Sequence, residues 1–312
     1  MTRILITGAG GGVGQALLRE LGGTDHQIIA TDIRALQDLP DNCSYQPLDV
    51  RNATVDQVIG ETRPQVIVHL ASIVSPPKGS TREFEYAVDV TGTQNIIDAS
   101  IAHGVERLVV TSSGAAYGYH ADNPVPLCET DAVRGNLEFA YAHHKRLVEE
   151  MLQKTRRQAP FLQQVVLRVG TVLGAGMENQ ITALFHRKRL LAISGHESPF
   201  VFIWTQDLAR ILVRAATAGP AGIFNVAGDG AMGITQIADV LHKPVMRLPA
   251  FLLKAALALA HPLGLSRYGP QQVRFLQYRP VLDNTKLKQE FGYTPEKTSA
   301  ETFDLWRRSA GL

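Results

Sequence analysis

The sequence predicts an α/β protein, with a doubly wound parallel sheet and a smaller, mostly helical domain beside it. Through the first 170 residues, short β-branched runs alternate with longer helical patterns. The apolar runs are nearly continuous rather than alternating, as expected of strands that are covered on both faces. A strand–helix–strand order repeated in this way implies right-handed crossovers between parallel strands.

The elements of this first region can be placed in chain order. Strands are expected at Arg3–Thr7, Gln27–Asp32, Val66–Leu70, Leu108–Ser112 and Gln164–Val169. Helices are expected between them, at Gly14–Leu21, Val55–Thr62, Glu83–His103 and Leu137–Gln158.

After residue 170 the alternation is less regular. Two further strands, Phe200–Trp204 and Ile223–Val226, flank an expected helix at Thr205–Ala218. The rest of the chain is mostly helical, and one helix should run from Asp283 to Phe291 because Gly292 and Pro295 are stop signals. We therefore expect one domain of residues 1–170 plus 200–227, and a second of residues 171–199 plus 228–312.

Composition limits the class of protein. Hydrophobic residues make up 45% of the 312 residues and charged residues 19%, which indicates a globular chain. The 31 basic and 29 acidic residues leave a net charge of +2. So small an excess cannot hold a phosphate backbone, and nucleic acid is not expected as a partner.

The cysteine content and the apolar stretches of the sequence indicate the cellular compartment of the protein. Two cysteines, Cys43 and Cys128, argue against a disulfide scaffold and suit a reducing compartment. The longest apolar stretch, Leu248–Leu265, contains two prolines, a lysine and a histidine, so no membrane span is predicted. Only Ile4-Leu5-Ile6 precedes a glycine-rich segment, which leaves no signal-peptide core. We expect a cytoplasmic protein.

The glycine-rich segment Thr7-Gly8-Ala9-Gly10-Gly11-Gly12-Val13-Gly14 lies between the first strand and the first helix. Gly8 permits a tight turn, Gly11 lets the backbone approach a pyrophosphate, and Gly14 lets the helix pack closely on the strand. The N–H groups that begin the helix would then face the phosphates. Glycine runs also occur in ordinary loops, so the context decides.

Asp32 ends the second strand, 18 residues after Gly14. A carboxylate at this place accepts hydrogen bonds from the adenosine ribose of a dinucleotide and repels a 2′-phosphate. NAD is therefore favoured over NADP. Arg34 leaves NADP open, because its guanidinium could pair with a 2′-phosphate. Alternatively, Asp32 is only a strand-end turn residue.

Tyr141 and Lys145 are four residues apart on a predicted helix and share a face. A tyrosine has a reference pKa of about 10. A lysine charge roughly 4 Å away, at an effective dielectric constant near 20, would lower that pKa by about three units, and desolvation opposes the change. Tyr141 could then act as a general acid/base. Alternatively, the pair belongs to an ordinary helix surface.

The loop from Thr111 to Gly118 begins where the fourth predicted strand ends, at the edge where open parallel sheets bind ligands. There, Ser113 could hydrogen-bond a substrate oxygen while Tyr141 exchanges its proton. Alone, a Ser-Ser-Gly loop is most often only a loop, but three such features in this order are more specific.

Together these motifs resemble the extended short-chain dehydrogenase/reductase family, in its NAD-dependent epimerase/dehydratase group. The resemblance covers nearly the whole chain. It rests on Gly8-x-x-Gly11-x-x-Gly14, Asp32, Asp49-Val50, His69-Leu70-Ala71-Ser72, Ser113, Tyr117-Gly118, Tyr141-x-x-x-Lys145, Leu167-Arg168, Asp207-Leu208-Ala209 and the tail Asp283–Leu287 with Gly292-Tyr293-x-Pro295.

The resemblance implies a Rossmann dinucleotide-binding domain, a substrate-binding cap and a catalytic triad of Ser113, Tyr141 and Lys145. Lys145 would also hold the nicotinamide ribose, and Asp49 would bind adenine through its side chain. His69 is expected to be structural. The full expected cofactor set is Gly8, Gly11, Gly12, Val13, Gly14, Asp32, Ile33, Arg34, Asp49, Val50, Leu70, Ala71, Ser72, Thr111, Tyr141, Lys145, Val169, Thr171 and Val172.

The resemblance also implies a homodimer, because in relatives of this family the helices that correspond to Glu83–His103 and Leu137–Gln158 often form a four-helix contact. No His/Cys spacing suggests a metal: His143 and His144 are adjacent on a helix and point apart.

Three positions depart from the family's pattern. Asp89 stands where an asparagine is usual. Thr171 and Phe200 stand where nucleotide-sugar enzymes carry an asparagine and an arginine that face the substrate diphosphate. Losing the arginine removes a bidentate charged contact, whereas Phe200 offers apolar surface. Ser113, Thr171 and Phe200 are the expected substrate contacts, unless Phe200 is a core residue of the cap.

Three functions remain. The first is an NAD(P)-dependent oxidoreductase that transfers hydride at a secondary alcohol or ketone of a small-molecule substrate, with Tyr141 as general acid/base. The second is a nucleotide-sugar epimerase, which Thr171 and Phe200 disfavour. The third is a non-catalytic dinucleotide-sensing protein, since fold alone does not fix function. The intact set of Ser113, Tyr141 and Lys145 favours an enzyme.

Overall fold

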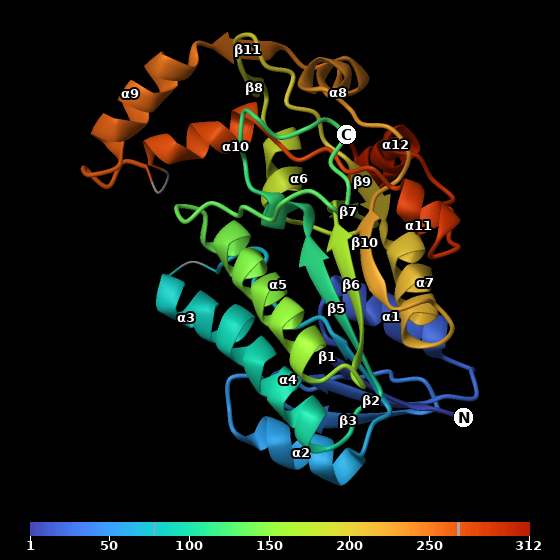
Figure 1. The fold of residues 1–312 in the computed structure, drawn as a ribbon. Coiled ribbons are helices and arrows are strands. Elements are labelled where there is room, and N and C mark those ends of the chain that lie inside the picture. Colours follow the sequence, from blue (N-terminus) through green and yellow to red (C-terminus); the bar gives the residue numbers. More distant parts are fainter. Residues whose placement is uncertain (78, 267–268) are drawn as a thin grey trace.

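The computed structural model describes residues 1–77, 79–266 and 269–312. A parallel seven-stranded sheet lies at the centre, in the order β10-β6-β5-β4-β1-β2-β3 (Figure 1). This order reverses beside β1, as in a doubly wound Rossmann sheet. Its strands are β1 (Arg3–Thr7), β2 (Gln27–Asp32), β3 (Cys43–Pro47), β4 (Val66–His69), β5 (Arg107–Ser113), β6 (Gln163–Val169) and β10 (Gly222–Val226).

Helices cover both faces of the sheet, because alternate residues of each strand point to opposite sides. Ile4 and Ile6 belong to the core under α1 (Gly12–Leu21) and α7 (Thr205–Ala216). Leu5 belongs to the core on the other face. The helices of that second face are α2 (Thr54–Thr62), α4 (Gly92–Ala102) and α5 (Ala140–Gln158).

The segment expected as one helix at Glu83–His103 is continuous but not uniform. It consists of α3 (Arg82–Tyr86), a π-helical turn η1 (Ala87–Thr91) and α4. Asp89 is in this turn and only 2% exposed. Single π-turns inside helices are frequent at functional sites, because they redirect side chains without ending the helix.

The cap lies above the carboxyl ends of the strands in Figure 1. Its core is an aromatic cluster that includes Phe185, Phe202, Phe303 and Trp306. Its strands pair as β7 (Thr171–Leu173) with β9 (Phe202–Trp204) and β8 (Leu190–Ile193) with β11 (Val245–Leu248). Its helices are α6 (Gln180–Phe185), α8 (Ile234–Leu241), α9 (Ala250–Ala260), α10 (Val273–Gln277) and α12 (Ser299–Ser309). Helix α11 (Thr285–Gln289) instead packs on β10, and Leu287 belongs to the core under α1 and α7. Two short 3₁₀ turns, η2 (Gly114–Tyr117) and η3 (Pro270–Gln272), complete the elements.

The expected fold class is confirmed, and most elements match within one to three residues. β3 was not anticipated. Its residues are all partly buried or exposed, because it is an edge strand of the sheet. The expected strand at Phe200–Trp204 begins at Phe202 and pairs with β7 rather than with the central sheet.

A buried ion pair joins α5 to β6. The Arg168 guanidinium donates to both carboxylate oxygens of Glu149, with Nε–Oε distances of 3.0 Å. Ser112 donates its hydroxyl to the same carboxylate, and Arg168 also donates to the Tyr117 hydroxyl at 2.8 Å. Because a buried charge is tolerated only when it is paired and hydrogen-bonded, this network fixes the position of α5 on the sheet.

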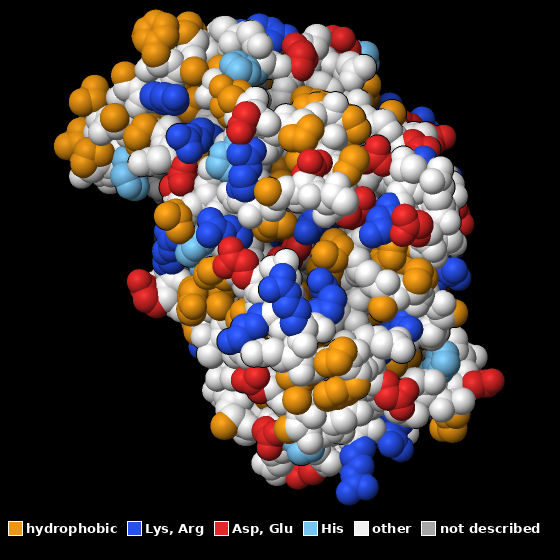
Figure 2. Space-filling model, viewed as in Figure 1, with side chains coloured by type: hydrophobic (Ala, Val, Ile, Leu, Met, Phe, Trp, Pro, Cys, Tyr) orange, Lys and Arg blue, Asp and Glu red, His pale blue; other side chains and the backbone are white. Residues whose placement is uncertain are grey.

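The surface is mixed in charge over most of the face in Figure 2. Apolar side chains gather at its upper left, over α9. Among the described residues, no helix combines the length and the apolar character needed to cross a bilayer.

Candidate active site

The glycine-rich turn between β1 and α1 is closed to a side chain by neighbouring backbone at Gly8 and Gly14. Gly8 has φ +68°, and a Cβ atom there would lie 2.7 Å from the backbone nitrogen of Ala71. A Cβ on Gly14 would lie 2.6 Å from the carbonyl oxygen of Ala9. The N-cap residue Gly11 provides no side-chain hydrogen bond, so the first N–H groups of α1 have no intrahelical or capping partner. The turn therefore fits the phosphates of a dinucleotide.

Asp32 lies at the end of β2 and faces this turn. It accepts hydrogen bonds from the backbone N–H groups of Gly10 (2.9 Å) and Arg34 (3.0 Å). Arg34 Nε lies 3.5 Å from the Asp32 carboxylate, so its charge is directed to Asp32. Ile33 is 71% exposed between them. A carboxylate in this place suits a ribose with a free 2′-hydroxyl, the form that NAD carries.

The next pair, Asp49 and Val50, follows β3. Arg51 donates to both oxygens of the Asp49 carboxylate, with its Nε at 2.9 and 3.0 Å, and these bonds hold the pKa of Asp49 below its usual range. The Val50 side chain is buried, and its carbonyl accepts from Asn95 Nδ2 at 2.8 Å. Val50 can therefore meet a ligand only through its backbone.

The segment Leu70-Ala71-Ser72 follows β4 and is held by Asp89. One Asp89 oxygen accepts from the Ser72 hydroxyl (2.9 Å) and from the Ile73 backbone N–H (2.8 Å). The other oxygen lies 3.0 Å from His144 Nδ1 on α5. The residue noted as a departure from the family's pattern thus ties the loop after β4 to α5.

His69 is structural, as expected. It is buried between the hydroxyls of Thr7 (2.7 Å) and Thr93 (3.0 Å). Burial lowers the pKa of His69 to about 3, so the ring is neutral at physiological pH.

Ser113, Tyr141 and Lys145 come together at the carboxyl end of β5. Lys145 Nζ donates to the carbonyl of Thr111 at 2.9 Å and lies 5.5 Å from the centre of the Tyr141 ring. Tyr141 and Lys145 therefore share one face of α5, as their spacing predicts. The Ser113 hydroxyl accepts from the Ala115 N–H at 3.1 Å.

The expectation that Lys145 lowers the pKa of Tyr141 is wrong for the structure without ligands. Burial raises the pKa of Tyr141 above its ordinary value, the Ser113 hydroxyl acts in the opposite direction, and the charge of Asp89 raises it further. Burial also lowers the pKa of Lys145, against the charges of Asp89 and Glu149. Desolvation exceeds the charge effect that spacing alone suggests.

Residues after β6 complete this edge of the sheet. Val169 is buried at the end of β6, while Thr171 and Val172 are partly buried on β7. The Val169 carbonyl lies 3.5 Å from the Ser113 hydroxyl. Because all these segments follow the carboxyl ends of parallel strands, the expected cofactor and catalytic residues converge on one edge.

Phe200 is the exception, and its expected role as a substrate contact is corrected. It is only 2% exposed and stacks on Phe202, with ring centres 5.7 Å apart. It also packs edge-on against Phe185. Phe200 is therefore a core residue of the cap, because its ring is covered from several sides.

Arg279 was missed by sequence reasoning. Its guanidinium lies over the rings of Phe200 (3.8 Å) and Phe275 (4.8 Å) and donates to the Ser198 carbonyl at 2.6 Å. Its buried Nε has no hydrogen-bond partner among the described residues. Burial lowers the pKa of Arg279 to about 9, so it still carries its charge at neutral pH. A signal was present in the sequence: no acidic residue lies between 240 and 282 to pair with it.

Aromatic side chains lie beside Tyr141. Tyr119 packs edge-on against Phe139 (4.9 Å) and Phe275 (5.3 Å), and the same cluster includes Tyr141 and Tyr278. Tyr141 therefore has aromatic neighbours in addition to Ser113 and Lys145, and the charge of Arg279 lowers the pKa of Tyr119, which burial raises.

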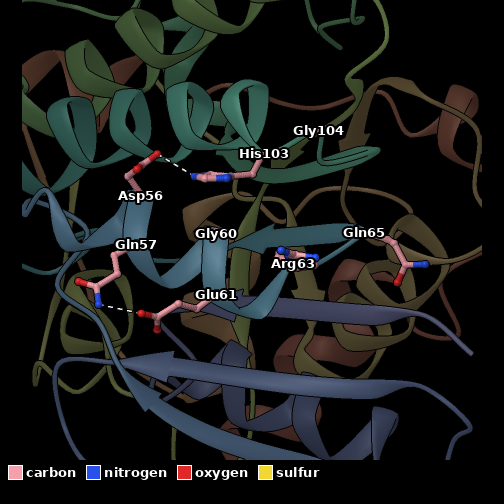
Figure 3. Close-up of a pocket in the computed structure, with 9 residues that line it drawn as sticks. Asp56, Gln57, Gly60, Glu61, Arg63, Gln65, His103 and Gly104 are labelled. Carbon is pink, nitrogen blue, oxygen red and sulfur yellow. Dashed lines mark hydrogen bonds and ion pairs between the residues drawn. The ribbon is translucent and has the colours of Figure 1, made fainter.

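Two hollows of the surface lie at different places, one beside the cap and one at the opposite edge of the sheet. One, of about 700 Å³, lies between the loop after β4 (Ser75, Pro76) and the cap (α6, Arg187, Leu265). The other, of about 480 Å³, is shown in Figure 3, with His103 Nε2 2.9 Å from Asp56 Oδ1. The second hollow lies where α2 and α4 end, before β4 and β5 begin. It is at the opposite edge of the sheet from the glycine turn and is not part of the candidate active site.

Among the described residues, no group of three or more His, Cys, Asp or Glu side chains is arranged to hold a metal ion.

Comparison with known proteins gives a family match. The sequence profile of the NAD dependent epimerase/dehydratase family matches residues 4–227. An uncharacterized protein of Mycobacterium tuberculosis is 26% identical over 265 residues, which cover 85% of this chain and 70% of that protein. A 3beta-hydroxysteroid-dehydrogenase/decarboxylase (isoform 2) of Arabidopsis thaliana is 26% identical over 262 residues, which cover 74% of this chain and 46% of that protein.

Solved structures show the same fold. WbmG of Bordetella bronchiseptica, solved with NAD, aligns with a TM-score of 0.76 at 21% identity and covers 99% of this chain and 94% of its own. The UDP-glucose 4-epimerase of Thermotoga maritima, solved with UDP-glucose, aligns with a TM-score of 0.75 at 19% identity and covers 99% and 98%.

The glycine turn yields the first prediction. Gly8→Ala should weaken NADH binding at least about tenfold, because the new methyl group would meet the Ala71 backbone and the left-handed backbone is strained. The measurement is a fluorescence titration of NADH. Gly23→Ala is the matched control: Gly23 has φ +76° with no atom within 4 Å of a Cβ, so it carries the strain without the collision. Equal affinities of the two variants would contradict the assignment.

Proposed function

Because the chain is an enzyme of the NAD dependent epimerase/dehydratase family, we propose that it is an NAD-dependent oxidoreductase that acts at a secondary alcohol or ketone. The observation that carries the proposal is the convergence of Ser113, Tyr141 and Lys145 beside the dinucleotide turn, with Lys145 held by the Thr111 carbonyl. Membership of an enzyme family argues against the non-catalytic alternative.

NAD, when bound, supplies the hydride acceptor or donor. The proton would be transferred by side chains of the protein itself. We assign Tyr141 as the group that gives a proton to a ketone oxygen or takes one from a hydroxyl, and Ser113 as the group that hydrogen-bonds the same oxygen. The raised pKa of Tyr141 keeps the phenol protonated before ligands bind, which is the state that a reduction requires.

Cofactor binding is assigned to residues at the carboxyl edge of the sheet. The glycine turn would hold the pyrophosphate, Asp32 the adenosine ribose and Lys145 the nicotinamide ribose. By the division expected from the sequence, residues 1–170 plus 200–227 would carry this function and residues 171–199 plus 228–312 would bind the substrate. Two elements lie differently: β9 pairs with β7 of the cap, and α11 packs on β10 of the central sheet. The remaining assigned cofactor contacts are Ile33, Arg34, Asp49, Val50, Leu70, Ala71, Ser72, Thr111, Val169, Thr171 and Val172.

The substrate is proposed to be a small molecule with an apolar body. Aromatic residues, Tyr119, Phe139, Phe275 and Tyr278, form the surroundings of Tyr141. The Arabidopsis relative, which is named as a hydroxysteroid dehydrogenase, also supports an apolar substrate. With Phe200 in the core, Ser113 and Thr171 remain as proposed substrate contacts.

A nucleotide-sugar epimerase is the second candidate. Arg279 favours it, because a guanidinium with a buried, unpartnered Nε and no carboxylate partner could receive an anionic group. The structural similarity to the UDP-glucose 4-epimerase of Thermotoga maritima also supports this candidate. Thr171 still counts against it, since a threonine replaces the usual asparagine.

We further propose that the protein works in the cytoplasm as a homodimer. Both cysteines, Cys43 and Cys128, are unpaired, which suits a reducing compartment. The proposed dimer contact is the face of α3, α4 and α5, where Phe84 (38%), Tyr86 (43%) and Ile101 (37%) keep apolar surface exposed.

Replacement of the phenol tests the mechanism. Tyr141→Phe should lower kcat by about 10²- to 10⁴-fold, the usual contribution of a positioned acid/base group, while NADH affinity changes less than about twofold. The measurement is steady-state turnover of a ketone with NADH, beside an NADH titration. Tyr86→Phe, which removes a phenol oxygen from α3, should leave both values unchanged. Full activity of Tyr141→Phe would remove the mechanism.

A substrate screen separates the two candidates. We expect NADH oxidation with one or more apolar ketones, and no large rise in melting temperature with UDP- or dTDP-linked sugars in the presence of NAD. A shift of several degrees with a nucleotide sugar, lost in Arg279→Gln, would favour the epimerase, because binding to the folded state alone raises its stability.

Light scattering tests the proposed dimer. The expected molar mass is twice the 34.0 kDa of the chain. Ile101→Glu should shift the distribution toward the monomer, since a charge at an apolar contact must be desolvated. A monomer of the wild-type protein at micromolar concentration would contradict the proposal.

A further inference from the structure

Helix α9 in the cap carries apolar side chains that nothing in the described chain covers. None of its 11 residues, AFLLKAALALA, is buried. Phe251 is 69% exposed and Leu259 71%, and the following turn adds Leu263 (70%) and Leu265 (79%). Figure 1 shows α9 projecting from the upper left of the molecule, and Figure 2 shows apolar side chains gathered there. We call Phe251, Leu252, Leu259, Leu263 and Leu265 the α9 patch.

The helix has two apolar sides. At 3.6 residues per turn, Leu253 and Leu257 lie on one side, and both are partly buried. That side is the one directed toward the molecule, where α9 contacts η3 and α10. Phe251, Leu252 and Leu259 lie on the opposite side and face away. An ordinary surface helix would carry polar residues there.

The two segments of the sequence nearest the patch contain basic but no acidic residues, although Glu178, just before the second segment, lines the hollow that Leu265 and Arg187 also line. Between residues 240 and 282 the sequence has no Asp or Glu, whereas the whole chain has nearly equal numbers of basic and acidic residues. Residues 179–196 likewise lack acidic side chains. The basic residues of the two segments are Lys243, Arg247, Lys254, Arg267, Arg274, Arg279, Arg187, Lys188 and Arg189.

Several of these charges adjoin the patch. Lys254 is an exposed residue of α9 itself, and Arg187 lines the same hollow as Leu265. The exposed side chains of Arg187, Lys188, Arg189 and Lys254 take part in no ion pair or hydrogen bond with the rest of the described chain. These cations are therefore available to an external partner.

The charges beside the α9 patch indicate which kind of partner binds it. A second copy of the chain docked symmetrically on the patch would bring the unpaired cations of both copies, Lys254 and Arg187–Arg189, to one interface without acidic partners for them, and like charges oppose such a contact. An anionic lipid surface offers the complement of both parts, since acyl chains accept the apolar side chains and phosphate headgroups accept the cations.

We propose that the α9 patch docks this enzyme on the surface of an anionic lipid bilayer, with Phe251, Leu252 and Leu259 inserted at the boundary of headgroups and acyl chains. Lys254 and Arg187–Arg189 pair with the headgroup phosphates. The helix lies in the plane of the surface and does not span the bilayer, for which it is too short.

Co-sedimentation of the full-length protein with vesicles tests the proposal. Vesicles of phosphatidylcholine with one quarter phosphatidylglycerol should bind the protein at 50 mM salt. Vesicles of phosphatidylcholine alone should bind it at least tenfold more weakly, and 500 mM salt should weaken binding to the anionic vesicles. Equal binding to both kinds of vesicle, or no binding to the anionic ones, would overturn the proposal.

Two variants identify the surface. Phe251→Glu/Leu259→Glu should lower binding to anionic vesicles at least tenfold, because it places carboxylates where acyl chains would lie. Phe161→Glu is the matched control: Phe161 is 55% exposed before β6, at the opposite edge of the sheet from the cap, and its change should leave binding intact. Lys254→Glu, a single exposed change, should weaken binding and reduce its salt dependence even if the double variant folds poorly.

Light scattering of the same variants excludes the alternative occupant. Phe251→Glu/Leu259→Glu should keep the molar mass of the wild-type protein in solution. A wild-type oligomer that the double variant dissociates would show that the patch is a contact between copies of the chain, and this outcome would overturn the proposal.

Discussion

A carboxylate buried as deeply as that of Asp89 must find a partner for each of its oxygens, because an ionised group removed from water is costly when unpaired. Asp89 finds them on two elements: Ser72 and Ile73 in the loop after β4, and His144 on α5. The segment proposed to line the cofactor and the helix that carries Tyr141 and Lys145 therefore cannot move independently. The π-helical turn supplies the geometry, since it directs Asp89 inward within a continuous helix.

The same charge acts on two residues of the proposed catalytic set, Tyr141 and Lys145. Asp89 raises the pKa of Tyr141 and partly offsets the loss of charge that burial imposes on Lys145. An asparagine at this position would hold the loop without that charge. The aspartate therefore adds to the effect of burial in raising the pKa of Tyr141, and it opposes the effect of burial in lowering the pKa of Lys145. In the oxidation direction that we propose, the phenol would have to lose its proton, and burial and the charge of Asp89 oppose that loss in the structure without ligands.

The central sheet could be predicted from the sequence because its strands are buried on both faces and hence read as continuous apolar runs. β3 could not, since an edge strand with partly exposed residues lacks that signal. The convergence of Tyr141 with Lys145 follows from local helix geometry. The pKa of Tyr141 does not, because it depends on burial and on Asp89, 52 positions earlier in the chain. Phe200 illustrates the same limit: only tertiary contacts with Phe185 and Phe202 distinguish a core ring from a substrate contact.

The cap holds apolar side chains of two kinds, and their surroundings separate them. Phe200 and its neighbours lie inside, where their packing holds the cap together, and Arg279 stacks on Phe200 without a carboxylate partner. Burial lowers the pKa of Arg279 to about 9, so the group remains charged at pH 7. The leucines of α9 lie outside and add nothing to that core. Side chains that stabilise neither the fold nor the active site, and that occur beside unpaired cations, are best explained by a partner outside the chain.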